Sequence, residues 1–350
     1  VRRDAMIRRP LRRLASAATV TALGLLATSC SGSDGEASVT ATSPVNAPTT
    51  PASTATTTVT TTTAAATTTT TTTDPGSPSP GLGEPPARLD TVFDSAQFAE
   101  RLSASHATMV DITATADERE RAGIDHQLVL RELADRPELD EEVLAALDPA
   151  ARPSVERVVR ARQFLQARSA TRPPQPPPDE LPAWTIVEPE PIETLLAHYA
   201  EAEQLTGVGW NWLAAIHLQE TRMGRIQGVS SANAVGPMQF LPETWARCCS
   251  GDPTVTRDAI IGAATYLAQS GAPADMAAAL YEYNPNDGYV AVVTAYAESL
   301  REEPELYTGD HAFQVFFGSS AGTVRLPDGN SQAAPIDAVE YQESNPQDAA

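Results

Sequence analysis

The sequence predicts a mainly α-helical protein behind a long disordered tether, and three observations lead to this fold class. From about residue 89 to residue 300, apolar residues recur at spacings of three and four, the period of helices with one buried face. Residues 31 to 88 are almost entirely Thr, Ser, Ala, Pro and Gly, which cannot build a core. A minor strand element, a short hairpin, is predicted between Val315 and Leu326.

The first 29 residues have the order of an export signal, in which an arginine-rich head precedes an apolar stretch from Leu14 to Ala27. This stretch is too short to remain as a membrane-spanning helix, which needs about 20 residues. The segment Ala27-Thr28-Ser29-Cys30 resembles the bacterial lipobox, in which the cysteine is lipidated. Because Ala27 stands where Leu is preferred, simple secretion is the alternative. We expect an exported protein, anchored by lipid on Cys30 to the outer face of the cytoplasmic membrane, beside the cell wall.

The composition divides the rest of the chain. After the tether of residues 30 to 88, three or four helices are predicted for residues 89 to 170, with breaks at Arg136-Pro137 and Asp148-Pro149. They would pack as a small antiparallel bundle, either a spacer or a binding surface for a cell-wall protein. A proline-rich strap at 171 to 190 should dock Trp184 and Ile186 on the main helical domain, residues 191 to 328. Residues 329 to 350 are predicted to be a loose tail.

Charge and cysteine content exclude several kinds of partner. The chain has 24 basic and 45 acidic residues, a net charge of -21, which disfavours nucleic acid as a ligand. None of the five histidines has a metal-ligand spacing and no glycine-rich phosphate loop is present, so we expect neither metal nor organic cofactor. Cys248 and Cys249 are adjacent. Because a vicinal disulfide is strained and rare, we expect buried thiols, with pairing between chains left open.

The candidate chemistry lies between Leu213 and Trp245. A helical stripe of buried residues leads up to Glu220, and Gly224 is the expected helix stop. A carboxyl group in the last turn of a helix, in apolar surroundings, has a raised pKa, because the helix dipole and desolvation both disfavour the anion. A carboxylic acid that stays protonated near neutral pH is what general-acid cleavage of a glycosidic bond needs.

The loop that follows this acid is suited to an uncharged ligand. Between Thr221 and Pro242 it contains no Asp or Glu, and its neutral hydrogen-bonding groups fit sugar hydroxyls and acetamides: Ser230, Ser231, Asn233 and Gln239. Glu243 is explained as a first-turn residue of the next helix. An ordinary glycosidase needs two carboxylates, and the loop offers no second one; assistance by a substrate N-acetyl group would remove that need.

Three blocks of this sequence resemble the catalytic domain of lytic transglycosylases, which is related to the soluble and membrane-bound type B enzymes and to goose-type lysozyme. These blocks are ETRMG at 220 to 224, AVGPMQFLPETW at 234 to 245 and YEYN at 281 to 284, within a similarity that spans about residues 191 to 300. The resemblance implies a lysozyme-like helical fold. It also implies cleavage of peptidoglycan between N-acetylmuramic acid and N-acetylglucosamine, with 1,6-anhydro ends as the product.

The resemblance implies one catalytic residue. Glu220 is similar to the family's single acid, which protonates the leaving oxygen and then takes the proton of the muramoyl 6-hydroxyl. Two other functions stay open at this point. The protein could be a muramidase that hydrolyses the bond as lysozyme does, or a catalytically silent lipoprotein that binds peptidoglycan.

The resemblance also implies substrate-binding residues, which are Thr221, Met238, Gln239, Phe240, Tyr283 and Asn284. Gln239 would hold an acetamide, and Tyr283 with Asn284 would orient the acid. Many family members have Ser where this chain has Thr221, and the hydroxyl is kept. The end of a helix before Pro285 is a structural explanation for Tyr283 and Asn284 that is compatible with this role.

Overall fold

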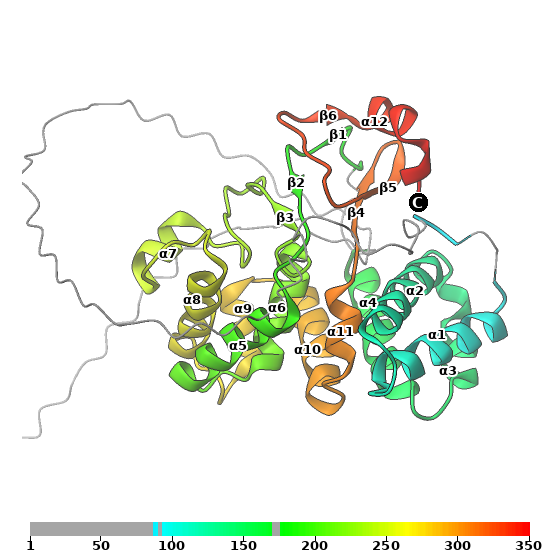
Figure 1. Cartoon of the computed structure of the whole chain (residues 1–350), viewed down its shortest axis with the longest axis horizontal. Helices are drawn as coiled ribbons and strands as arrows, with labels where there is room; N and C mark the ends of the chain where they lie inside the picture. The colour runs from blue at the N-terminus through cyan, green and yellow to red at the C-terminus, as the bar shows by residue number, and fades with distance from the viewer. Residues whose placement is uncertain (1–86, 90–92, 170–175) are drawn as a thin grey trace, which may run out of the picture. The chain divides into compact units, whose positions relative to one another are not determined.

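The structure is a computed structural model that describes residues 87–89, 93–169 and 176–350. It is mainly helical, as the sequence predicts, with twelve α-helices and three small strand pairs in this part of the chain (Figure 1). The export signal, lipid attachment at Cys30 and the tether lie outside the described residues. No described helix has both the length and the apolar character needed to cross a bilayer.

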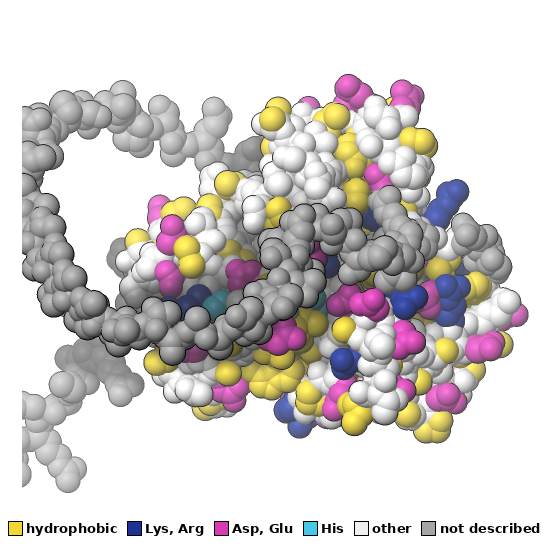
Figure 2. All heavy atoms as spheres, in the orientation of Figure 1, with side chains coloured by type: hydrophobic (Ala, Val, Ile, Leu, Met, Phe, Trp, Pro, Cys, Tyr) yellow, Lys and Arg dark blue, Asp and Glu magenta, His cyan; other side chains and the backbone are white. Residues whose placement is uncertain are grey.

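Four helices occupy the range of the expected bundle. They are α1 (Ser95–Val110), α2 (Ala116–Ala134), α3 (Asp140–Ala146) and α4 (Arg152–Ser169), with a 3-10 turn at Pro137–Leu139 before α3. The first two helices begin with capping boxes, which satisfy free N–H groups at each helix start. A buried ion pair between Arg162 and Asp140 joins α4 to α3. Acidic and basic side chains are mixed over the surface of these helices (Figure 2).

Seven further helices follow. They are α5 (Ile192–Thr206), α6 (Trp210–Thr221), α7 (Pro242–Cys248), α8 (Thr256–Gln269), α9 (Met276–Tyr283), α10 (Asp287–Glu302) and α11 (Leu306–His311). Helix α6 packs against α5, α8 and α10, and α10 also packs against α4. The sequence did not predict α11, which contacts α2. One hydrophobic core contains residues from every helix between α1 and α11, so the first four helices share their interior with the next seven.

The remaining segments form a smaller unit, here called the β lobe, which consists of residues 180–187, 226–227 and 315–350. Its strands pair antiparallel: β1 (Glu180–Leu181) with β6 (Ile336–Asp337), β2 (Thr185–Ile186) with β3 (Ile226–Gln227), and β4 (Val315–Ser319) with β5 (Gly322–Leu326). The last pair is the expected hairpin. The lobe has its own core, to which Leu181 and Ile186 of the strap contribute, and Trp184 packs edge-on against Phe317 at 5.7 Å between ring centroids.

The prediction of a loose tail was wrong. Residues after 329 form β6, helix α12 (Ala338–Ser344) and a 3-10 turn at Pro346–Asp348. Ala338 and Tyr341 are buried in the core of the β lobe, and Asp348 forms a buried ion pair with Arg325 at 2.8 Å. The segment looks polar in sequence because it buries only a few residues, and their partners lie in strands far away along the chain.

The prediction of free thiols was also wrong, because Cys248 and Cys249 form a disulfide. Helix α7 ends at Cys248, and the backbone of Cys249 is extended, with φ -132° and ψ 169°. The two side chains therefore do not point in the diverging directions that adjacent residues have within a helix. Inside a helix, the sulfur atoms of two adjacent cysteines would diverge.

Candidate active site

Glu220 lies in the last turn of α6 and is 3% exposed. Burial raises the pKa of its carboxyl group to about 7, while the neighbouring Tyr289 hydroxyl and the Arg222 guanidinium favour the charged form and limit the rise. No carboxylate is among the described groups that act on this acid. The arrangement can therefore hold a proton near neutral pH and release it to a bound acceptor.

Helix α6 ends earlier than the sequence predicted. Its last helical residue is Thr221, and Arg222 and Met223 adopt left-handed backbone conformations with φ of 54° and 60°, so Gly224 is not the stop. The Thr221 hydroxyl donates to the Pro237 carbonyl oxygen at 2.6 Å and accepts from the Gly224 N–H at 3.1 Å. This hydroxyl joins the helix end to the following loop, which explains why a hydroxyl residue is placed beside the acid.

The second sequence block, residues 234 to 245, forms a tight loop that the Thr221–Pro237 hydrogen bond connects to the end of α6. The backbones of Val235 and Phe240 exchange two hydrogen bonds of 2.9 Å, and Gly236 sits at φ 75° where an added Cβ would lie 1.8 Å from the Pro253 carbonyl oxygen. Only glycine fits there. The Gln239 side-chain amide donates to the Gly236 carbonyl oxygen at 2.9 Å. Within the described residues its own carbonyl oxygen accepts no hydrogen bond, which suits the N–H of an acetamide.

Aromatic side chains connect this loop to the acid. The Tyr283 hydroxyl donates to the carbonyl oxygen of Met238, which is fully buried, at 2.5 Å. The Tyr283 ring lies edge-on to Phe240 at 5.7 Å and parallel to Tyr289 at 6.4 Å between centroids. Burial and the nearby Glu220 together raise the pKa of Tyr283 well above its usual value. The structure thus places Tyr283 near Glu220, and Met238 and Phe240 in contact with Tyr283.

Asn284 is placed differently. It ends α9, and its backbone N–H donates to the Leu280 carbonyl oxygen at 2.9 Å. No contact among the described residues joins its side chain to Glu220. The structural explanation given by Pro285 accounts for this position, and an orienting role for Asn284 stays a prediction.

Sequence reasoning missed two buried groups, one beside the acid and one beside Arg222. Tyr289 lies on the buried face of α10, and its hydroxyl is beside Glu220. Asp310 of α11 is 6% exposed, and burial raises the pKa of its carboxyl group to about 7, with Arg222 opposing the rise. The period of α10 could have indicated Tyr289, because residue 289 starts its buried stripe. No local pattern indicated Asp310, since α11 itself was not predicted.

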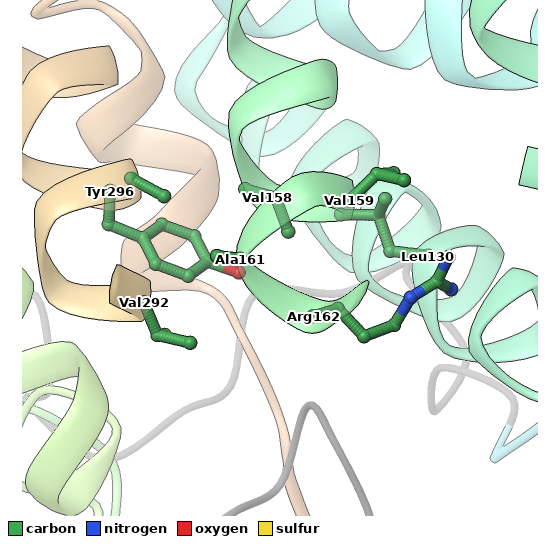
Figure 3. A pocket seen from close by; sticks show the side chains of 8 residues that line it. Leu130, Val158, Val159, Ala161, Arg162, Val292 and Tyr296 are labelled. Atoms are coloured by element: carbon green, nitrogen blue, oxygen red, sulfur yellow. The ribbon is translucent and has the colours of Figure 1, made fainter. Parts of the chain in front are cut away.

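No cluster of metal-binding side chains occurs in the described part of the chain, so the site offers no recognisable metal centre there. A cavity lies elsewhere, between α4 and α10, where Tyr296 points toward Ala161 (Figure 3). Its lining is almost entirely apolar and does not include Glu220, Tyr283 or Tyr289.

A comparison with known proteins found a relative of this chain. The chain is 32% identical over 124 residues to the membrane-bound lytic murein transglycosylase F of Thiobacillus denitrificans, a match that covers 33% of this chain and 26% of that relative. The chain thus corresponds to about a quarter of the relative's length. No protein-family model and no solved structure matches the chain. The similarity gives weak support for a lytic transglycosylase.

Proposed function

We propose that this protein is a peptidoglycan lytic transglycosylase with Glu220 as its single acid and base. The observation that carries the proposal is the burial of one carboxyl group, with a pKa of about 7, at the end of α6 beside a loop without acidic residues. The likeness to a protein named as a lytic murein transglycosylase supports the same reaction class.

In the proposed reaction, one proton moves from Glu220 to the leaving oxygen, and a second returns to Glu220 from the 6-hydroxyl. Glu220 donates it to the glycosidic oxygen as the bond between that oxygen and C1 of N-acetylmuramic acid breaks. The resulting carboxylate then takes the proton of the 6-hydroxyl while this oxygen bonds to C1 and closes the 1,6-anhydro ring. No water is consumed, and Glu220 is protonated again at the end. A pKa near the working pH suits both steps, because the group must first give and then accept a proton.

Binding of the sugar is assigned to the loop and the aromatic cluster. Gln239 would accept from an acetamide N–H with its carbonyl oxygen, and Phe240 and Tyr283 would form an apolar wall. Thr221 would act mainly by holding the loop against the end of α6, and Met238 by holding it against Tyr283 of α9. Asn284 is kept as a substrate contact on the resemblance alone.

Product analysis tests the reaction. Peptidoglycan digested with the purified protein should yield fragments with 1,6-anhydro ends, which are one water molecule lighter than hydrolysed ends in a mass spectrum. Reducing ends in place of anhydro ends would show a muramidase instead. Intact peptidoglycan, retained by a protein that still binds it, would show the silent binding lipoprotein.

Tyr289→Phe tests how the surroundings of Glu220 determine its pKa. The Tyr289 hydroxyl stabilises the charged form of Glu220, so its removal should raise the pKa of Glu220 further. Because the first step needs the protonated acid, the alkaline limb of the rate profile should move to higher pH. The measurement is the cleavage rate between pH 5 and 9. Tyr266→Phe is a matched control, because that hydroxyl donates to the Glu282 backbone at 3.1 Å; an equal shift in both variants would contradict the assignment.

We also infer that the enzyme works outside the cytoplasmic membrane, held by lipid on Cys30 and by the tether, with the first four helices free to bind a cell-wall protein. The support is the order of segments in the sequence. Cys30→Ala should move the protein from the membrane fraction to the medium, and an unchanged distribution would reject the lipid anchor.

A further inference from the structure

Arg222 is a buried cation at the end of α6. Its side chain is 2% exposed, and its Nη1 donates to the carbonyl oxygen of Leu218, one turn earlier in the helix. This bond folds the side chain back along the last turn. Within the described residues, the Nε and Nη2 atoms of Arg222 have no hydrogen-bond partner. The guanidinium is therefore held at one nitrogen and keeps N–H donors on the other two for a carboxylate.

Two buried carboxyl groups lie near this guanidinium. They are Glu220 of α6 and Asp310 of α11, which are 3% and 6% exposed. Burial raises the pKa of each to about 7, and Arg222 favours the charged form of both. Among the described charged groups, Arg222 is the one that acts on both carboxyl groups. Because Glu220 and Asp310 ionise over the same pH range, one guanidinium serves two anions that form together.

The other groups around Arg222, Glu220 and Asp310 keep a constant charge between pH 5 and 9. Arg131 of α2 lies near Arg222 and stays a cation, because burial lowers its pKa only to about 10. His217, in the same helical turn as Glu220, stays neutral because burial lowers its pKa to about 3. Burial also raises the pKa of four tyrosines, which stay neutral: Tyr283, Tyr289, Tyr296 and Tyr307. Among these described groups, only the two carboxyl groups change charge.

We propose that Arg222 stabilises the Glu220 carboxylate that exists between the two proton transfers, and that Asp310 competes for the same guanidinium and so limits this effect. The proposal rests on the function proposed above, since it concerns Glu220 after it has given up its proton. While Asp310 is protonated, the unpaired N–H groups of Arg222 are free to turn toward Glu220. Once Asp310 ionises, it attracts the guanidinium away from Glu220. Both are positioning residues, which act on the substrate through Glu220.

Opposite shifts of one pKa test this arrangement. Asp310→Asn keeps the shape of the side chain but cannot ionise, so the guanidinium stays with Glu220 and should lower the pKa of Glu220 by roughly half a unit. Arg222→Gln removes the charge and should raise that pKa by about one unit. A role in packing alone would not move the pKa in opposite directions.

Thermal unfolding of the full chain gives this pKa without any need for cleavage. Each variant is compared with the same variant carrying Glu220→Gln, and the difference in melting temperature is followed between pH 4 and 9. The pH at which this difference develops reports the pKa of Glu220 in that variant. An unchanged or raised pKa of Glu220 in Asp310→Asn would overturn the proposal, even if Arg222→Gln proves unable to fold.

The competition itself is tested by combining the two substitutions. If Asp310 acts through the guanidinium, Asp310→Asn should have no further effect on the pKa of Glu220 in a protein that already carries Arg222→Gln. The same shift in both backgrounds would mean direct repulsion between the carboxyl groups and would reject the competition. Arg222→Lys keeps the positive charge, so it should hold the pKa of Glu220 closer to the wild-type value than Arg222→Gln does.

Asp348→Asn is the matched control. It makes the same substitution at a buried carboxyl group that is paired with an arginine, Arg325, in the β lobe. It should leave the pKa of Glu220 unchanged, and a shift equal to that of Asp310→Asn would contradict the specific role of Asp310.

Cleavage assays separate this proposal from the proposed function. In an active protein, the alkaline limb of the rate profile should move to lower pH in Asp310→Asn and to higher pH in Arg222→Gln, because the first step needs protonated Glu220. If the wild-type protein cleaves no glycan, the proposed function fails. The unfolding measurements still decide whether Arg222 and Asp310 control the proton of Glu220.

Discussion

Glu220→Gln is expected to reduce glycan cleavage by roughly 10³-fold or more, because the amide has no proton to give to the leaving oxygen and cannot accept one in return. The side chain keeps its shape, so the folded structure should be unchanged. The measurement is the initial rate of release of soluble fragments from purified peptidoglycan, together with a circular dichroism spectrum. The expected loss affects turnover, with binding of the glycan retained.

The same substitution should stabilise the protein at alkaline pH. The pKa of Glu220 is raised to about 7 in the folded state from 4.5. The folded state therefore binds this proton more tightly, and stability from this group is full below pH 4.5 and is lost as the pH rises to about 7. Gln cannot ionise and avoids the loss. Above pH 7 the variant should be more stable than the wild type by up to about 3 kcal/mol, a difference that vanishes at low pH.

Glu243→Gln is the matched control for both effects. Glu243 is exposed in the first turn of α7, and its replacement should change neither cleavage nor the dependence of thermal unfolding on pH. Wild-type cleavage by Glu220→Gln would remove this residue from the chemistry. A melting temperature that responds to pH equally in the wild type and the Gln variant would show that the carboxyl group is not held protonated.

Gly123→Ala is expected to destabilise the protein, although the same change in a helix usually stabilises it by about 1 kcal/mol. Gly123 of α2 faces Gly309 of α11, and an added Cβ would lie 2.2 Å from the Gly309 carbonyl oxygen. Backbone cannot move aside as a flexible side chain can, so α2 and α11 must separate. Overpacking of this kind costs about 1–3 kcal/mol. Denaturant unfolding measures the change directly.

Gly309→Ala is the useful contrast. Its added Cβ would meet the side chain of Met109, with the terminal methyl at 2.4 Å. Because a methionine side chain can rearrange, we expect a smaller loss of stability than for Gly123→Ala. Equal losses, or a gain of stability in Gly123→Ala, would mean that α2 and α11 do not approach as closely as described. Separation of these helices should also disturb Asp310, which lies next to Gly309 on α11.

Local patterns predicted most of the helices and the acid. The spacing of apolar residues predicted α6 and its buried face. Local patterns failed where the conformation of a residue depends on contacts with residues far away along the chain. The left-handed conformation of Arg222 is an example, because a residue with a side chain adopts it only when surrounding contacts hold it there.

Sequence alone determined that this chain is mainly helical in its described part, and it singled out Glu220 as a carboxyl group at the end of an apolar helix. Only the tertiary structure decided which groups surround that acid, that the final residues pack into the β lobe, and that the strap lies beside the loop after α6. The physical reason is the distance along the chain over which each effect acts. Helical periodicity and capping act over a few neighbouring residues, whereas desolvation of a carboxyl group and pairing of short strands depend on segments far apart in the chain.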